Sequence, residues 1–175
     1  MEKSRKNIII ISLDDAFAFW HYKKIFGIEL KTPNLDRICA QSTAFHSAYC
    51  QSPLCGPSRA SFMSGKAPPQ TGVYSNKEKV FQKIAPQEMW PFQLKENGYF
   101  CSSGGKVHHG FKPLGKDVHA VFYSDERKSF RIDLKLRKEF EQTANGGNGG
   151  GISTTNPKDD GYFYDAHSAA SFVKF

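Results

Sequence analysis

The sequence predicts an α/β fold, a mostly parallel sheet flanked by helices. Residues 8–13 form a continuous apolar run rich in isoleucine, which is typical of a strand buried on both faces of a parallel sheet. Helix start and stop signals recur after this run. Three groups of polar side chains each follow a predicted strand, as βαβ units with a shared site would place them. With 175 residues, the chain is long enough to bury a core.

Composition is that of a soluble globular protein with an excess of basic residues, which a solvated basic face also explains. Apolar residues make up 39% and charged residues 23% of the chain, and the net charge is +7. A basic surface attracts anions of any kind, but no nucleic-acid-binding module accompanies the charge, so we expect no nucleic-acid partner. No apolar stretch reaches transmembrane length, so we expect no membrane partner either.

The N-terminus and the cysteines bear on the cellular compartment. Residues 1–6 are basic, but the apolar run behind them ends in Asp14 and Asp15 without a small-residue cleavage site. We therefore see no signal peptide and expect a cytoplasmic location by default. The four cysteines lack C-x-x-C spacing, which predicts free thiols.

The first third of the chain predicts a strand, a helix and a second strand. Residues 7–13 form the first strand, which places Asp14 and Asp15 at its carboxyl end, where open α/β sheets bind ligands. A helix begins with Thr32 as N-cap and Pro33 as first residue. Residues 43–49 are the second predicted strand.

A short helix is predicted to follow Cys55. Pro57 suits the first helical turn, and Gly65 suits the left-handed position that ends a helix. Cys55 would then lie at the positive helix end, with Arg59 one turn later, and free backbone N–H groups would favour an anion there. The alternative is a buried cysteine in a loop–helix joint.

The middle of the chain predicts a loop, a helix and a third strand. Residues 71–83 are polar and predict a loop, Pro86 opens a helix that ends at residues 97–98, and residues 99–103 predict a strand. The glycine-rich residues 104–110 follow. Later in the chain we expect a flexible, glycine-rich insertion at residues 142–160.

Each of the three polar groups has a chemical interpretation and a plainer alternative. Paired carboxylates such as Asp14 and Asp15 suit a hard cation, Ca²⁺ or Mg²⁺, although they also occur as strand-end turns or helix caps. Lys106 could clamp an anion or be an exposed lysine. His108 and His109 could be surface residues, metal ligands or acid–base groups.

Taken together, these motifs resemble the type I sulfatases of the alkaline phosphatase superfamily. Residues 55–59, Cys-Gly-Pro-Ser-Arg, look like that family's C-x-P-S-R signature. The order of motifs also matches, from the Asp pair to Gly105-Lys106, and the Gly-Lys-Val-His-His-Gly spelling is closest to the iduronate-2-sulfatase branch. The resemblance covers residues 7–110 and implies an alkaline phosphatase-like sheet.

The resemblance implies a covalent mechanism at Cys55. A formylglycine-generating enzyme would oxidise Cys55 to formylglycine, whose hydrate attacks the sulfur of a sulfated sugar or aryl sulfate and then eliminates sulfate. Asp14, Asp15 and the modified Cys55 would bind Ca²⁺, with Mg²⁺ as the alternative.

The resemblance also implies the roles of the basic residues. Arg59 would orient the formylglycine, and Lys106 would stabilise charge on the sulfate. His109 takes the histidine role by the iduronate-type spacing, and His108 would take it by the shorter arylsulfatase spacing.

Family members are longer than this chain and take further metal ligands from a late segment. We therefore expect residues 1–175 to be the N-terminal part of a sulfatase catalytic domain, with a truncated sheet and negligible activity by itself. Two alternatives are a phosphonate monoester or phosphodiester hydrolase of the same superfamily and a non-catalytic truncated product.

Overall fold

The computed structural model describes residues 5–14, 16, 24–109, 114–125, 166 and 169–170. The chain divides into two compact units, Met1–Cys50 and Gln51–Phe175. The helices of the described parts are α2 (Pro33–Ala40), α3 (Cys55–Ser64), α4 (Pro68–Thr71), α5 (Val80–Lys83), the 3₁₀ helix η1 (Pro86–Glu88), α6 (Trp90–Glu96) and α7 (Lys116–Phe122).

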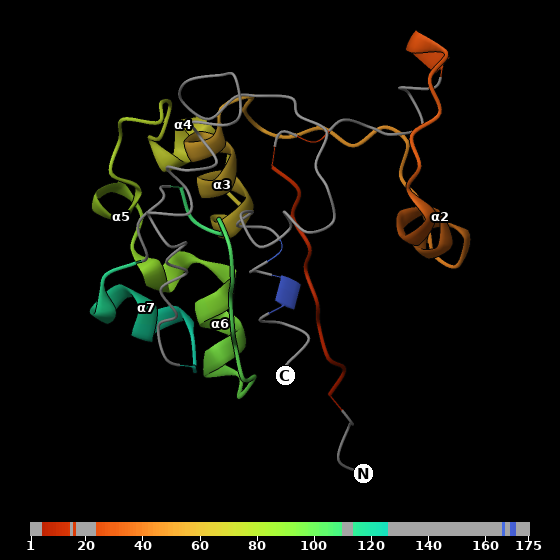
Figure 1. The fold of residues 1–175 in the computed structure, drawn as a ribbon. Coiled ribbons are helices and arrows are strands. Elements are labelled where there is room, and N and C mark those ends of the chain that lie inside the picture. Colours follow the sequence, from red (N-terminus) through yellow and green to blue (C-terminus); the bar gives the residue numbers. More distant parts are fainter. Residues whose placement is uncertain are drawn as a thin grey trace, which may run out of the picture. The chain divides into compact units, whose positions relative to one another are not determined.

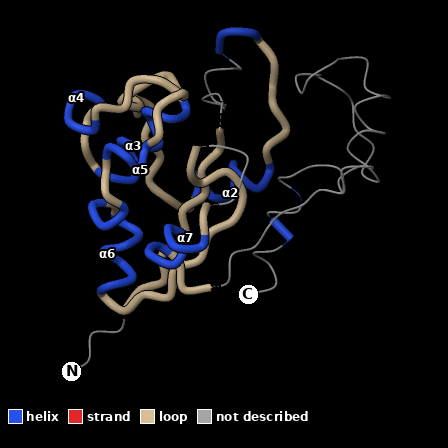
Figure 2. The backbone as a smooth tube through the Cα atoms, turned by 90° about the vertical axis from the view of Figure 1, so that its left-hand side faces the viewer, coloured by secondary structure: helices blue, strands red, loops and turns tan. Residues whose placement is uncertain are grey.

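The predicted parallel sheet is wrong for the described residues, which contain helices and loops but no strand (Figure 2). Residues 8–13 are an extended segment whose isoleucines are exposed, Ile9 to 84% and Ile11 to 76%. Residues 43–49 and 99–103 also lack strand pairing. A strand needs the N–H and C=O groups of a neighbouring segment, and β-branched composition alone does not supply that partner.

The helix boundaries predicted from local signals are confirmed. Helix α2 has Thr32 as N-cap and Pro33 as first residue, and the Thr32 hydroxyl hydrogen-bonds the Asp36 carboxylate at 3.0 Å. Helix α3 ends at Gly65, which adopts the left-handed conformation with φ of 69° and donates its N–H to the Ser61 carbonyl. These signals act within one turn of chain, so they do not depend on distant contacts.

The polar segment at 71–83 is more structured than predicted. Helix α4 ends inside it, at Thr71, and α5 forms its last turn. The helix predicted to open at Pro86 is confirmed but divided into η1 and α6 at Met89, whose backbone is extended. The Glu88 side chain accepts the Ala85 N–H at 3.1 Å and so caps η1.

The unit Gln51–Phe175 has a small apolar core enclosed by helices α3 to α7 (Figure 1). On the edge of the core, the Phe62 ring of α3 packs edge-on against Trp90 of α6, with ring centroids 5.8 Å apart. The core therefore joins the helix that carries Cys55 to the later helices. Its buried residues are Ala60, Met63, Val73, Ile84, Met89, Phe122 and Tyr123.

Truncating a core side chain tests this packing. Ile84 is 2% exposed, so replacing it with valine removes one buried methyl group. We expect Ile84→Val to lower the free energy of unfolding by about 1 kcal/mol. Urea unfolding measures the change, and an unchanged midpoint would contradict the core assignment.

Two further features complete the fold. Within the described residues, no helix has the length and apolarity needed to cross a membrane. The predicted insertion at residues 142–160 lies outside the described residues, as does Asp15.

Candidate active site

The first turn of α3 carries Cys55 and is tied to a neighbouring loop. Cys55 is the first residue of α3 and is half-buried, while Gly56 and Pro57 are buried. The Gly56 N–H donates to the Asn76 side-chain oxygen at 2.7 Å. Asn76 therefore holds the backbone immediately after Cys55.

The free backbone N–H groups predicted at this helix end are largely in use. Gly56 donates to Asn76, Ser58 donates to the Leu54 carbonyl at 2.9 Å, and Pro57 has no N–H. An anion beside Cys55 would consequently depend on side-chain cations such as Arg59 more than on helix N–H groups.

Gly56 has little room for a side chain. A β-carbon at this position would lie 2.9 Å from Asn76 Oδ1 and 3.4 Å from Asn76 Cα. We expect Gly56→Ala to displace Asn76 and break the hydrogen bond, which would lower the free energy of unfolding by about 1–3 kcal/mol. Thermal unfolding of the two proteins measures this. Equal stability would show that Asn76 moves without cost.

Arg59 joins α3 to the loop of residues 105–109. Its guanidinium Nη1 donates to the Lys106 carbonyl and, at 2.8 Å, to the Val107 carbonyl. Arg59 lies one helical turn after Cys55, so the same face of α3 presents both residues. The structure thus brings together Cys55, Arg59 and the Lys106 backbone, three of the sequence-predicted positions.

A cavity of about 500 Å³ lies beside this junction. Arg59 and both candidate histidines line it, together with Gly56 and Asn76. Its remaining walls come from α3, from α5 and the loop before it, and from the junction of η1 and α6, namely Ala60, Met63, Lys77, Glu78, Lys79, Val80, Phe81, Gln82 and Met89. The cavity has both polar and apolar lining residues.

The two candidate histidines have different environments. His108 stacks on Phe122 with ring centroids 5.1 Å apart, and its Nε2 lies 2.8 Å from the Tyr123 hydroxyl. Burial, together with the nearby Arg59 charge, lowers the pKa of His108 to about 4, so its imidazole is neutral at pH 7. His109 is exposed and lines the cavity. His108 is packed into the protein against Phe122, whereas His109 is exposed.

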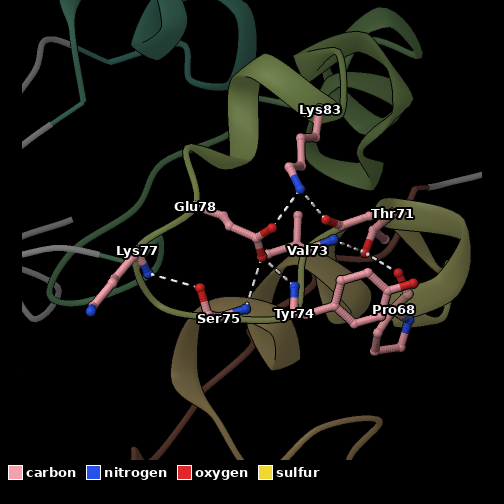
Figure 3. A network of polar contacts seen from close by, with 9 residues as sticks. Pro68, Thr71, Val73, Tyr74, Ser75, Lys77, Glu78 and Lys83 are labelled. Carbon is pink, nitrogen blue, oxygen red and sulfur yellow. Dashed lines mark hydrogen bonds and ion pairs between the residues drawn. The ribbon is translucent and has the colours of Figure 1, made fainter.

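The loop that carries Asn76 is fastened by an ion pair (Figure 3). The Glu78 carboxylate accepts the backbone N–H groups of Tyr74 and Ser75, the latter at 2.8 Å. The Lys83 ammonium donates to the Glu78 carboxylate and to the Gly72 carbonyl. The loop is therefore held to α5 through Lys83.

The sequence interpretation missed Asn76, Glu78 and Lys83 because they fall in a segment predicted as a polar loop. A signal for Glu78 was present in its spacing, since a carboxylate three residues after Ser75 can fold back onto turn N–H groups. Nothing in the sequence indicated that Asn76 would meet Gly56, which lies 20 residues earlier.

Acid pH should weaken this loop. The Lys83 hydrogen bond, and then the Tyr74 and Ser75 N–H groups, lower the pKa of Glu78 from 4.5 to about 2. Because the pKa of Glu78 is lower in the folded state, its ionised carboxylate stabilises the fold fully above pH 4.5. This contribution is lost as the pH falls toward 2 and the carboxylate becomes protonated. We expect the stability difference between the natural protein and Glu78→Gln to shrink as the pH falls from 7 to 3. Urea unfolding at each pH measures it, and a pH-independent difference would contradict this prediction.

The predicted metal site is not tested by the described structure. Asp14 is exposed in the unit Met1–Cys50, Cys55 belongs to the unit Gln51–Phe175, and Asp15 lies outside the described residues. Among the described residues, no three His, Cys, Asp or Glu side chains cluster as metal ligands. The donor chemistry of Asp14 suits a hard cation such as Ca²⁺.

Comparison with known proteins identifies the family. The sequence model of the sulfatase family, described as "Sulfatase", matches residues 6–173, nearly the whole chain. The chain belongs to the sulfatase family. This confirms the family predicted from the C-x-P-S-R motif. It implies a formylglycine, a divalent cation and sulfated substrates in general terms.

Named relatives include several sulfatases. The chain is 36% identical over 118 residues to an N-acetylgalactosamine-6-sulfatase of Canis lupus familiaris, a match that covers 61% of the chain and 22% of that protein. It is 35% identical over 149 residues to a choline-sulfatase of Rhizobium meliloti, a match that covers 76% of the chain and 28% of that protein. It is 34% identical over 104 residues to an iduronate 2-sulfatase of Mus musculus, a match that covers 59% of the chain and 18% of that protein.

The chain spans about a quarter of the length of the curated relatives it matches. No solved structure matches it significantly. The iduronate type is among the relatives, but so are sulfatases with other named substrates, so the comparisons do not select one substrate.

Proposed function

We propose that this sulfatase-family chain contributes the nucleophile and anion-binding residues of a sulfuric-ester hydrolase. The observation that carries the proposal is the junction at Arg59, which ties the Cys55 helix to the 105–109 loop beside a cavity. A sulfated substrate needs a nucleophile and cationic groups in one place, and this junction supplies the start of such a site.

Cys55 is the proposed nucleophile position. A formylglycine-generating enzyme would oxidise it to formylglycine with molecular oxygen as the oxidant and with loss of the thiol sulfur. One hydroxyl of the hydrated aldehyde would attack the ester sulfur and expel the alcohol, and the other would then drive elimination of sulfate and re-form the aldehyde. It is half-buried at the start of α3, and the next residue, Gly56, lines the cavity, although Cys55 itself does not. Asn76 fixes the backbone on its C-terminal side.

Arg59 and Lys106 are the proposed anion-binding residues. Arg59 is anchored through the Lys106 and Val107 carbonyls, so its guanidinium is fixed against the 105–109 loop, one helical turn along α3 from Cys55. Lys106 is half-buried in the loop that Arg59 holds. Together they would offset the negative charge of a sulfate ester.

His109 is the proposed histidine of the site, with leaving-group protonation as its role. It is exposed and lines the cavity, whereas His108 is neutral and packed against Phe122. Both histidines line the cavity, but a leaving-group acid needs a proton to give, and the lowered pKa of His108 leaves its imidazole without one at neutral pH.

Asp14 and Asp15, with the modified Cys55, are the proposed ligands of a divalent cation, with Ca²⁺ preferred. Carboxylate oxygens are the donors that such cations prefer. When bound, the cation would supply positive charge beside the nucleophile and the sulfate oxygens.

Substrate preference tests the proposal. Residues 1–175 alone are expected to have negligible activity, so the protein is assayed at the length at which its native host makes it, with Ca²⁺, on an aryl sulfate, an aryl phosphonate monoester and a phosphodiester. We expect the sulfate ester to be turned over with the highest kcat/KM. Preference for the phosphonate monoester or the phosphodiester would assign the other hydrolase activity of the superfamily. Absence of all three activities would favour a non-catalytic product.

A further inference from the structure

A continuous set of contacts connects α5 to the turn that carries Cys55. Lys83 of α5 holds the Glu78 carboxylate, and Glu78 holds the N–H groups of Tyr74 and Ser75 (Figure 3). The next residue, Asn76, accepts the Gly56 N–H at 2.7 Å. The contacts end at the residue adjoining Cys55.

We propose that Glu78 and Lys83 are positioning residues for the nucleophile, because they hold Asn76 against the backbone of the Cys55 turn. This inference rests on the proposed function, in which Cys55 is the nucleophile. Glu78 also lines the cavity and Lys83 does not, so an equal effect of Lys83→Met separates positioning from direct contact with substrate.

Val73 anchors the start of the loop in the core, but the part that carries Asn76 has less support. Residues 73–79 form no helix, and Asn76 and Lys77 are exposed. Lys83 also donates to the Gly72 carbonyl, so a single ammonium fastens the start of the loop and, through Glu78, its end. Losing either charge would free the segment that carries Asn76.

The position of Gly56 makes the coupling direct. Its hypothetical β-carbon would lie 2.9 Å from Asn76 Oδ1, so the loop and the first turn of α3 are in close contact. A shift of the loop would therefore change the hydrogen bond at Gly56 and the orientation of the peptide that follows Cys55. Small displacements of a nucleophile can cost up to about 100-fold in rate.

The same unit contains a matched control. Glu88 also pairs with a lysine, Lys66, and also accepts a backbone N–H, that of Ala85. Both carboxylates have lowered pKa values for the same first cause, a lysine hydrogen bond. The Glu88 pair supports η1, however, and not the loop that carries Asn76.

The first experiment observes the Gly56 amide by NMR in the full chain, with variants Glu78→Gln, Lys83→Met, Lys83→Arg and Glu88→Gln. We expect Glu78→Gln and Lys83→Met to move the Gly56 amide proton upfield and to lower its exchange protection about tenfold. Lys83→Arg can keep the hydrogen bonds to the Gly72 carbonyl and the Glu78 carboxylate, so its Gly56 amide signal should match that of the natural protein. Glu88→Gln should leave it unchanged.

The second experiment measures kcat and KM on an aryl sulfate with the Ca²⁺-loaded protein from the native host. We expect Glu78→Gln to lower kcat about tenfold with KM within about twofold, and Glu88→Gln to change neither beyond about twofold. An unmoved Gly56 amide in Glu78→Gln, or an equal kcat loss in Glu88→Gln, would overturn the inference. If the natural protein has no turnover, the proposed function fails, and the Gly56 signal alone decides whether the loop is coupled to α3.

Discussion

Replacing Cys55 with alanine is expected to lower sulfate-ester turnover by ~10⁴-fold or more, because the variant cannot form the hydrated aldehyde. Fold stability should change little, since Cys55 is half-buried at the helix start and lies outside the buried core. Initial rates on an aryl sulfate, at equal protein and Ca²⁺ concentration, measure the effect.

Cys50→Ala is the matched control for this variant. Cys50 is also a free cysteine but is exposed and precedes α3. It should retain the natural rate. Turnover in Cys55→Ala within about tenfold of the natural rate would show that the chemistry uses another residue.

Replacing Arg59 with lysine is expected to lower kcat about 100-fold. Arg59 Nη1 donates to both the Lys106 and the Val107 carbonyls, and the planar guanidinium fixes the geometry of the two hydrogen bonds. A lysine ammonium is a single point charge on a different stem, so it cannot both hold the loop and orient the nucleophile. Steady-state kinetics on an aryl sulfate measure the loss.

Arg37→Lys is the control for Arg59→Lys, because Arg37 is exposed on α2 in the other unit. We expect it to leave kcat within about twofold of the natural value. If Arg59→Lys kept the natural kcat while its stability fell, Arg59 would serve only to hold the 105–109 loop.

Helix ends were predictable from sequence because their determinants are local. Thr32 and Pro33 start α2, and Gly65 ends α3, through contacts within one turn. The sheet was predicted from composition, and that prediction failed for the described residues. Residues 8–13 have the β-branched side chains of a buried strand, but a strand also needs a paired neighbour from elsewhere in the chain.

The candidate site was predictable only in part for a similar reason. The motif spelling singled out Cys55, Arg59 and the 106–109 loop, and Arg59 does join the helix to that loop. Asn76 was missed because its role depends on a contact 20 residues away in sequence. The environment of His108 likewise depends on Phe122 and Tyr123 from a later segment. No local sequence pattern predicts these contacts.

Mass spectrometry of the peptide that contains Cys55, prepared from protein made in the native host, tests the central claim most directly. The proposed mechanism requires an aldehyde at this position and therefore predicts a peptide with formylglycine in place of the cysteine thiol. An aldehyde-specific hydrazide label should then attach to that peptide alone. An unmodified Cys55 thiol in every preparation would contradict the mechanism.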